Sequence, residues 1–190
     1  MGQYYKPAIL ADNKTTVKAW VYSHDVTYKF KRNDGTEVEI GNGLKLMEHS
    51  YIGNEFVSAF ESLILDKPQR VVWAGDYADI CKKRKTNVYY RCLGKTKVLP
   101  YTRPKTRQTR FIINHTKKEF VDKNNVAEIK GWEGAKIHPL PLLTCEGNGG
   151  GDYYGVVGAK YVGTWARDII SVSAKKPSNE FVEIKPNFKE

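Results

Sequence analysis

Hydrophobic and polar residues alternate with a period of two along most of the chain, the pattern of half-buried β-strands. The clearest case is residues 26–40, where two alternating runs flank an Asn-Asp-Gly turn at 33–35 and predict a β-hairpin. Residues 109–123 follow the same pattern around a second turn. Residues 3–10 predict another strand, in which Pro7 indicates an edge position or a bulge. Further strand candidates are rich in β-branched and aromatic residues: 15–22, 70–75, 168–174 and 181–184.

Residues 54–66 carry the 3.6-residue period of an amphipathic helix instead. Their apolar residues recur at i, i+1, i+4, i+7 and i+8 counted from Phe56. Asn54 can cap the start of this helix, and Pro68 ends it. Strands outnumber helices and do not alternate with them regularly. The sequence therefore predicts an α+β fold, a mostly antiparallel sheet with one principal helix packed on it, and we expect residues 1–190 to form a single domain.

Charge is spread unevenly along this pattern. The 190-residue chain has 31 Lys or Arg and 21 Asp or Glu, a net charge of +10. Residues 82–123 hold 14 of the bases and two acids, a net charge of +12, which leaves 17 bases and 19 acids, a net charge of −2, to the rest. A polyanionic partner is therefore expected at this segment. Within it, dense charge and two prolines predict that 82–110 is an exposed, loop-rich insertion, and we expect 175–190 to be a partly frayed tail.

Composition also restricts the class of protein. No run approaches the roughly 18 uninterrupted apolar residues of a membrane helix, and the first residues lack the order of a signal peptide. Three widely spaced cysteines, Cys81, Cys92 and Cys145, indicate free thiols in a reducing compartment. We therefore expect a cytoplasmic protein with no membrane partner.

The basic segment is the sharpest binding candidate. Clusters of Lys and Arg bind phosphate backbones through counterion release, and interleaved tyrosines can stack on unpaired bases. No motif of a sequence-reading nucleic-acid module accompanies the segment. A solvated loop and an acidic protein partner are the alternatives. The candidate polyanion-binding residues are Lys82, Lys83, Arg84, Lys85, Arg91, Arg103, Lys105, Arg107 and Arg110.

A second candidate site gathers polar residues from turns and predicted strand ends. The glycine-rich stretch 147–152 ends in Asp152, where a phosphate-binding loop needs lysine, so it is either a connection or a wall that aims polar groups at a ligand. Acids just past a strand suit catalysis or metal binding but also cap turns, and His49 offers an imidazole for acid–base work. No histidine pair has metal spacing, so no metal site is assigned. No cofactor is identified, although a divalent cation would suit such oxygen ligands. The candidate ligand-binding residues are His49, Asp76, Tyr77, Asp79, Asn148, Asp152 and Tyr153.

Several longer phrases occur together in the sequence: MGQYYK (1–6), GLKLMEHS (43–50) with GNEF (53–56), VVWAGDYAD (71–79), INHTKKEF (113–120) and HPLPLLTCEGNGGGDYYG (138–155). With these motifs the chain resembles a family of small uncharacterised proteins of bacteria and their phages. The resemblance covers most of the chain outside roughly residues 10–42 and 80–110. It implies an accessory protein inside a bacterial host cell, often phage-borne, and it carries no established activity or catalytic residue.

Three functions follow from these observations. The first is a nonenzymatic protein that binds nucleic acid or another acidic surface through residues 82–110, for example to block a host defence or another nucleic-acid-directed system. The second is a nucleotide or small-molecule site at Asp76, Asp152 and His49, in its catalytic form a metal-assisted hydrolase or transferase. The third is a virion or assembly component whose aromatic sheet pairs with copies of itself. We rank the binding function first because the positive charge is localised in one segment. The sequence does not determine the oligomeric state or whether the protein is an enzyme.

Overall fold

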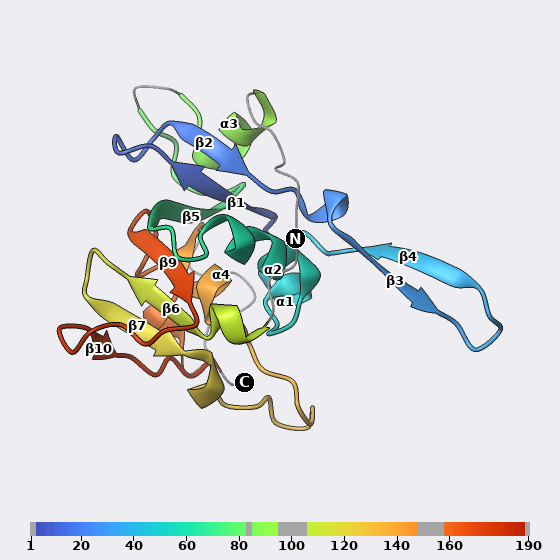
Figure 1. Cartoon of the computed structure of the whole chain (residues 1–190). Helices are drawn as coiled ribbons and strands as arrows, with labels where there is room; N and C mark the ends of the chain where they lie inside the picture. Colours follow the sequence, from blue (N-terminus) through green and yellow to red (C-terminus); the bar gives the residue numbers. More distant parts are fainter. Residues whose placement is uncertain (1–2, 83–84, 95–105, 148–157, 189–190) are drawn as a thin grey trace.

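The computed structural model describes residues 3–82, 85–94, 106–147 and 158–188. Its strands are β1 (Tyr5–Leu10), β2 (Val17–Trp20), β3 (Thr27–Lys31), β4 (Glu37–Gly41), β5 (Gln69–Gly75), β6 (Phe111–Asn114), β7 (Glu119–Asp122), β8 (Cys145–Glu146), β9 (Ile169–Ser173) and β10 (Val182–Glu183). Its α-helices are α1 (Leu46–His49), α2 (Glu55–Leu63), α3 (Val88–Arg91) and α4 (Pro139–Thr144). Figure 1 shows how these elements lie in space.

One sheet of eight strands organises the body of the molecule. Its order is β10-β7-β6-β9-β5-β1-β2, and β8 pairs with β5 off this path. Five of the strand pairs are antiparallel, and the two short strands β10 and β8 pair in parallel. The prediction of an α+β fold with a mostly antiparallel sheet is confirmed.

Helix α2 is the principal helix that the sequence predicted, and it is the longest among the described residues. The Asn54 side chain accepts hydrogen bonds from the backbone N–H groups of Phe56 (3.0 Å) and Val57 (3.2 Å), as expected of an N-cap. The apolar face, which includes Phe60, is buried against the sheet. The helix ends three residues earlier than predicted, because the chain turns back at Asp66, whose φ is +51°.

Strand β1 corrects the expectation of an edge position at Pro7. It lies between β2 and β5, and its irregularity against β2 falls between Ile9 and Leu10. Tyr5, two residues before Pro7, donates its backbone N–H to Leu44 O rather than to β5. Backbone N–H groups two residues apart in a strand face the same side. Pro7 therefore costs no hydrogen bond to β5, and a proline fits inside the sheet.

The two faces of β1 and β5 are covered differently. On one face, Tyr5, Ile9 and Trp73 belong to the main hydrophobic core with α2 and α4. On the other face, Ala8, Leu10, Val72 and Ala74 pack with Val88 and Cys92 of the α3 region. Because side chains alternate along a strand, Lys6 lies on this second face with Ala8 and Leu10. This face carries the candidate site.

Strands β3 and β4 confirm the predicted hairpin and form a separate two-stranded sheet. Thr27 pairs with Gly41 at one end and Lys31 pairs with Glu37 at the other. Gly35, with φ of +86°, makes the tight turn. The hairpin projects from the body as an arm (Figure 1).

The last strand lies where the sequence predicted it: β10, within 181–184, pairs with β7, and Phe188 is buried, whereas Lys175 and Lys176 are exposed. The described part of 82–110 is more helical than a loop, since it contains α3 and two 3₁₀ turns, Cys92–Gly94 and Thr106–Thr109.

Candidate nucleic-acid interface

A buried lysine is the centre of the candidate site. Lys6 on β1 is 2% exposed, and its Nζ lies 4.0 Å from the ring centroid of Tyr89, 5.2 Å from that of Trp20 and 5.7 Å from that of Tyr22. Aromatic faces attract a cation and favour the charged ammonium. Burial acts in the opposite direction and lowers the pKa of Lys6. No described carboxylate forms an ion pair with this ammonium.

Three segments distant in sequence build this arrangement. Ala8 of β1 pairs with Trp20 of β2, which places Trp20 on the same face as Lys6. Helix α3 brings Tyr89, and buried Asn87 anchors the start of that helix. The Asn87 side chain accepts from Tyr90 N (3.2 Å) and donates to the backbone oxygens of Asp76 (2.9 Å) and Ala78 (3.1 Å). The loop after β5 and α3 are thus held together beside Lys6.

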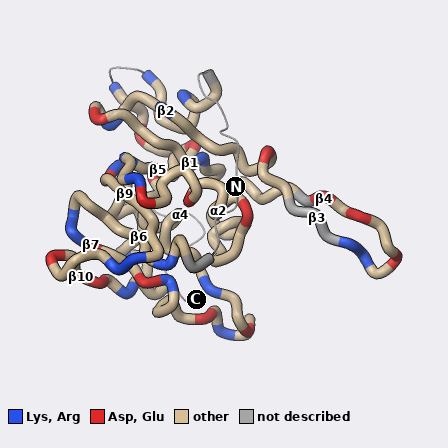
Figure 2. The backbone as a smooth tube through the Cα atoms, viewed as in Figure 1, with Lys and Arg blue, Asp and Glu red and all other residues tan. Residues whose placement is uncertain are grey.

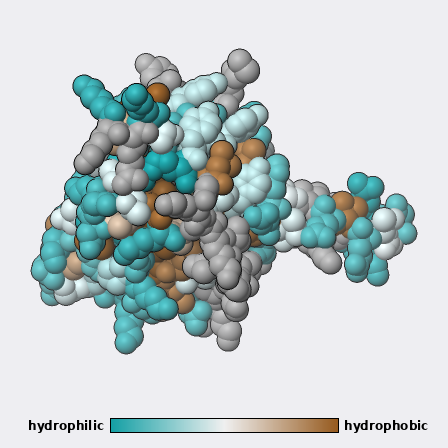
Figure 3. Space-filling model, turned by 90° about the horizontal axis from the view of Figure 1, so that it is seen from above, coloured by the Kyte–Doolittle hydropathy of each residue, from teal (hydrophilic) through white to brown (hydrophobic). Residues whose placement is uncertain are grey.

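Exposed aromatic residues lie on segments next to the covered lysine and to α3. Tyr4, Tyr77 and Tyr90 are 43%, 47% and 51% exposed. Asp76 connects the segments that carry these tyrosines. Its side chain accepts the backbone N–H of Tyr4 (3.2 Å), and Tyr77 follows it in the chain. Burial, together with the charge of Asp76, raises the pKa of Tyr89, the neighbour of Tyr90. Ile80 and Leu93 add exposed apolar surface. From above, hydrophobic residues and residues of intermediate hydropathy lie together on this side (Figure 3). We call Tyr4, Tyr77 and Tyr90 with Lys6 and its rings the α3 face.

The α3 face carries an excess of positive charge. Lys82 and Lys85 are exposed in the turn that leads into α3, and neither forms an ion pair with a described residue. Arg91 is half-buried in the last turn of α3. Lys6 and these three bases face two acids, Asp76 and Asp79, so the described charges sum to +2. Figure 2 shows Lys and Arg around β2 and α3.

Most of the remaining bases of 82–123 are paired with an acid or lie outside the described residues; Lys117 is exposed and donates to Thr164 O. Arg110 forms a two-fold ion pair with Asp122, with Nε–Oδ1 and Nη2–Oδ2 distances of 3.0 and 2.6 Å, which raises the pKa of Arg110 and neutralises its charge locally. Lys123 is buried in a pair with Glu61, and Lys118 lies 3.4 Å from Glu180. Lys83, Arg84, Arg103 and Lys105 lie outside the described residues, as does the side chain of Arg107. The excess charge is therefore concentrated before residue 110.

His49 does not belong with the other residues of the predicted ligand pocket. It is fully buried, its Nδ1 lies 3.0 Å from Gly43 O, and its Nε2 accepts from Trp73 Nε1 (2.9 Å). Burial lowers the pKa of His49 to about 4. With both nitrogens engaged inside the core, His49 is a structural residue, and we remove it from the candidate ligand-binding set.

Asp76, Tyr77 and Asp79 do lie together, on the loop after β5, and they border the α3 face. Asp76 holds the backbone of Tyr4 from both sides: its Oδ1 accepts from Tyr4 N, and its own N–H donates to Tyr4 O (3.0 Å). Asn148, Asp152 and Tyr153 lie outside the described residues. Within the described part of the chain, no group of three or more His, Cys, Asp or Glu side chains could hold a metal ion.

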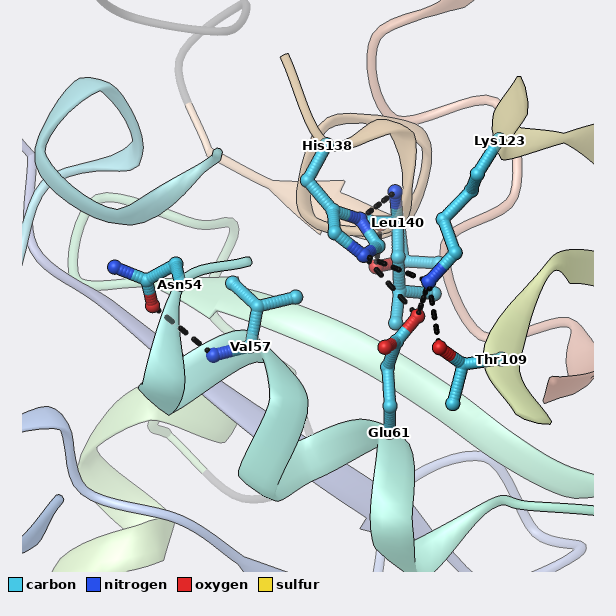
Figure 4. Close-up of polar contacts among 8 residues, drawn as sticks. Asn54, Val57, Glu61, Thr109, Lys123, His138 and Leu140 are labelled. Atoms are coloured by element: carbon cyan, nitrogen blue, oxygen red, sulfur yellow. Dashed lines mark hydrogen bonds and ion pairs between the residues drawn. The ribbon is translucent and has the colours of Figure 1, made fainter. Parts of the chain in front are cut away.

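A second polar cluster lies in the core and was not predicted from the sequence (Figure 4). Glu61 Oε1 accepts from Lys123 Nζ (2.6 Å) and His138 Nε2 (3.1 Å), and Lys123 also donates to Thr109 Oγ1 (2.9 Å). His138 Nδ1 accepts from Leu140 N (3.2 Å), so the proton is on Nε2 and points to Glu61. We call Glu61, Lys123, His138 and Thr109 the core cluster. All four residues are buried, so the core cluster cannot meet a ligand from solvent.

The electrostatics of the core cluster are those of a satisfied ion pair. Burial raises the pKa of the Glu61 carboxyl, but Lys123 and His138 outweigh burial and lower this pKa to about 2. Burial also lowers the pKa of His138, which is thus a neutral donor near pH 7. His115 bonds to Ser171 Oγ (2.8 Å), and burial lowers its pKa. The cluster links α2, α4 and the two ends of the β6–β7 hairpin.

Comparisons with known proteins add no functional information: no family model, no curated protein and no solved structure matches this chain. Among the described residues, no helix is long and apolar enough to cross a membrane.

Proposed function

We propose that this protein is a nonenzymatic binding protein that contacts nucleic acid through the α3 face. The observation that carries the proposal is the combination on this face of half-exposed tyrosines, a buried lysine and two exposed lysines, none of which forms an ion pair with a carboxylate of the described residues. Elsewhere the described bases of 82–123 include several that are already paired with acids. A phosphate backbone would supply the negative charge that the α3 face lacks.

The rest of the basic segment strengthens this assignment. Residues 82–110 contain 11 Lys or Arg and no Asp or Glu. The candidate bases Lys83, Arg84, Arg103 and Lys105 are part of this stretch and would add to the same electrostatic footprint. In a bacterial cytoplasm, the setting that the sequence resemblance implies, such a protein would act as an accessory factor by occupying nucleic acid that a host system must reach.

Anisotropy of a fluorescein-labelled oligonucleotide tests the proposal. We expect binding that weakens steeply with salt, and the double variant Lys82→Ala/Lys85→Ala should flatten the slope of log affinity against log salt by roughly one to two, about 0.7 per lost phosphate contact to a single strand. The matched control is Lys130→Ala/Lys175→Ala, which removes two exposed lysines from other loops. Affinity independent of salt, or equal losses in the two double variants, would refute the assignment.

A further inference from the structure

The tyrosines of the α3 face are presented in a way that indicates the kind of nucleic acid. Tyr4 precedes β1, Tyr77 follows β5, and Tyr90 is on α3, so three separate backbone segments support them. Each leaves about half of its surface to solvent, although burial of an aromatic ring is favourable. Aromatic side chains on a rigid basic surface are the platforms on which unpaired bases stack.

Tyr89, the ring next to Tyr90, already packs on Lys6, and this contact determines which of the two tyrosines faces solvent. Tyr89 and Tyr90 meet edge to face, with ring centroids 5.3 Å apart, and Tyr89 lies on the Lys6 ammonium. Lys6 therefore holds Tyr89 inward, and Tyr90 is the member of the pair that faces solvent. The same ammonium is too buried to contact a phosphate, but it places a positive charge beneath Tyr89 and would attract a nearby phosphate through its field.

Duplex nucleic acid would use this surface poorly. Its nucleobases are already stacked on each other, so exposed tyrosines gain little from them. A duplex backbone is contacted chiefly by Lys, Arg and polar groups, so the tyrosines of the α3 face would have no role on a duplex. A single strand satisfies both features, because its bases can splay onto the rings while its phosphates meet the lysines.

We infer that the α3 face binds single-stranded nucleic acid by stacking unpaired bases on Tyr77 and Tyr90 beside Lys6. This inference rests on the proposed function, since it names the ligand class of the same surface. It assigns affinity for strands in general to Lys82 and Lys85, and the preference for unpaired strands to the tyrosines.

The test compares three probes: labelled oligothymidylate, a labelled duplex of the same length, and heparin, which has charge but no bases. Wild-type protein should prefer the single strand to the duplex. The variant Tyr77→Leu/Tyr90→Leu should lose roughly thirtyfold or more in single-strand affinity, since it removes two rings and stacking is worth about 1–3 kcal/mol per base, and it should keep its heparin affinity. Trp132→Leu, which removes an exposed aromatic residue stacked on Tyr51, is the matched control and should change neither.

The outcomes separate the inference from the proposed function. If duplex and single strand bind equally, or if Tyr77→Leu/Tyr90→Leu binds oligothymidylate as tightly as Trp132→Leu, the stacking inference is overturned while salt-dependent nucleic-acid binding stands. If wild type binds none of the three probes, or binds only an acidic polypeptide such as polyglutamate, the proposed function fails as well. Thermal unfolding of each variant shows that it is folded, and both tyrosines are exposed enough to be replaced without loss of core.

Discussion

The molecule buries two lysines, Lys6 and Lys123, in opposite ways. Lys123 is 6% exposed and donates to Glu61 and Thr109 in the core cluster. Lys6 is 2% exposed and meets three aromatic rings on the α3 face, with no ion pair to a described carboxylate. A buried charge is costly unless it is paired, so the first lysine is part of a complete internal structure and the second leaves a charge unbalanced.

The difference shows how to separate a structural polar residue from a binding one. The core cluster has a buried carboxylate, and its donors converge on one oxygen, so nothing more is needed from outside. The α3 face has exposed rings and bases beside Lys6, so an anionic ligand would complete it. Titratable residues in the core cluster are therefore expected to govern stability, and those on the α3 face to govern binding.

Replacing each lysine by methionine gives the largest contrast. Lys123→Met leaves the Glu61 carboxylate buried without its cation and should lower the free energy of unfolding by about 3–5 kcal/mol. Lys6→Met removes a buried charge without leaving an orphaned carboxylate, so its free energy of unfolding should stay within about 1 kcal/mol of wild type or rise. Urea denaturation measures both. Equal destabilisation by the two variants would show that Lys6 and Lys123 contribute to stability in the same way.

His49 predicts a loss of stability in acid. Its pKa in the folded protein, about 4, lies below the usual 6.5, so its contribution is complete above pH 6.5 and is lost as pH falls toward 4, when the unfolded chain takes up the proton. The full effect is about 3 kcal/mol. His138 and His115 act in the same direction.

Denaturation at a series of pH values tests this contribution. His49→Gln cannot titrate and should flatten the fall in stability between pH 6.5 and 4, with the remaining slope due to the other two histidines and, near pH 4, to Glu61. His24→Gln, which changes an exposed histidine, is the control. An unaltered slope in His49→Gln would show that the folded protein binds a proton at this site as readily as the unfolded chain.

Arg110 gives the smallest expected effect on binding, although the sequence placed it in the polyanion set. Its guanidinium is paired with Asp122, so Arg110→Ala should weaken oligonucleotide binding less than Lys82→Ala does. The Arg110 guanidinium is exposed to solvent, so the variant should change stability little. A larger loss of affinity for Arg110→Ala than for Lys82→Ala would move the binding surface toward β6 and β7.

Local patterns explain what the sequence predicted. The β3–β4 hairpin follows from alternation around Asn-Asp-Gly, and α2 follows from its period and from Asn54 as N-cap. The prediction of an edge strand from Pro7 was wrong. Whether a proline disrupts a sheet depends on which neighbouring strand its backbone nitrogen faces, and the sequence does not show how β1 is paired.

The candidate site depended on contacts that no local pattern contains. Glu61 meets Lys123 and His138 across 62 and 77 residues of sequence. Lys6 meets Tyr89 only because β1, β5 and α3 pack together. One signal was present in the sequence. Lys6 alternates onto the same strand face as Ala8 and Leu10, and a lysine is unusual on such an apolar face. His49 gave no such signal, because a buried and an exposed imidazole look alike in sequence.

Photo-crosslinking to an oligonucleotide containing 5-iodouracil, followed by mass spectrometry of the peptides, tests the central claim most directly. If the α3 face is the binding site, the crosslinks should map to Tyr77 and Tyr90, and excess unlabelled oligothymidylate should compete them away. Crosslinks confined to the β3–β4 arm or to β6, β7 and β10, with Tyr77 and Tyr90 unmodified, would contradict the account.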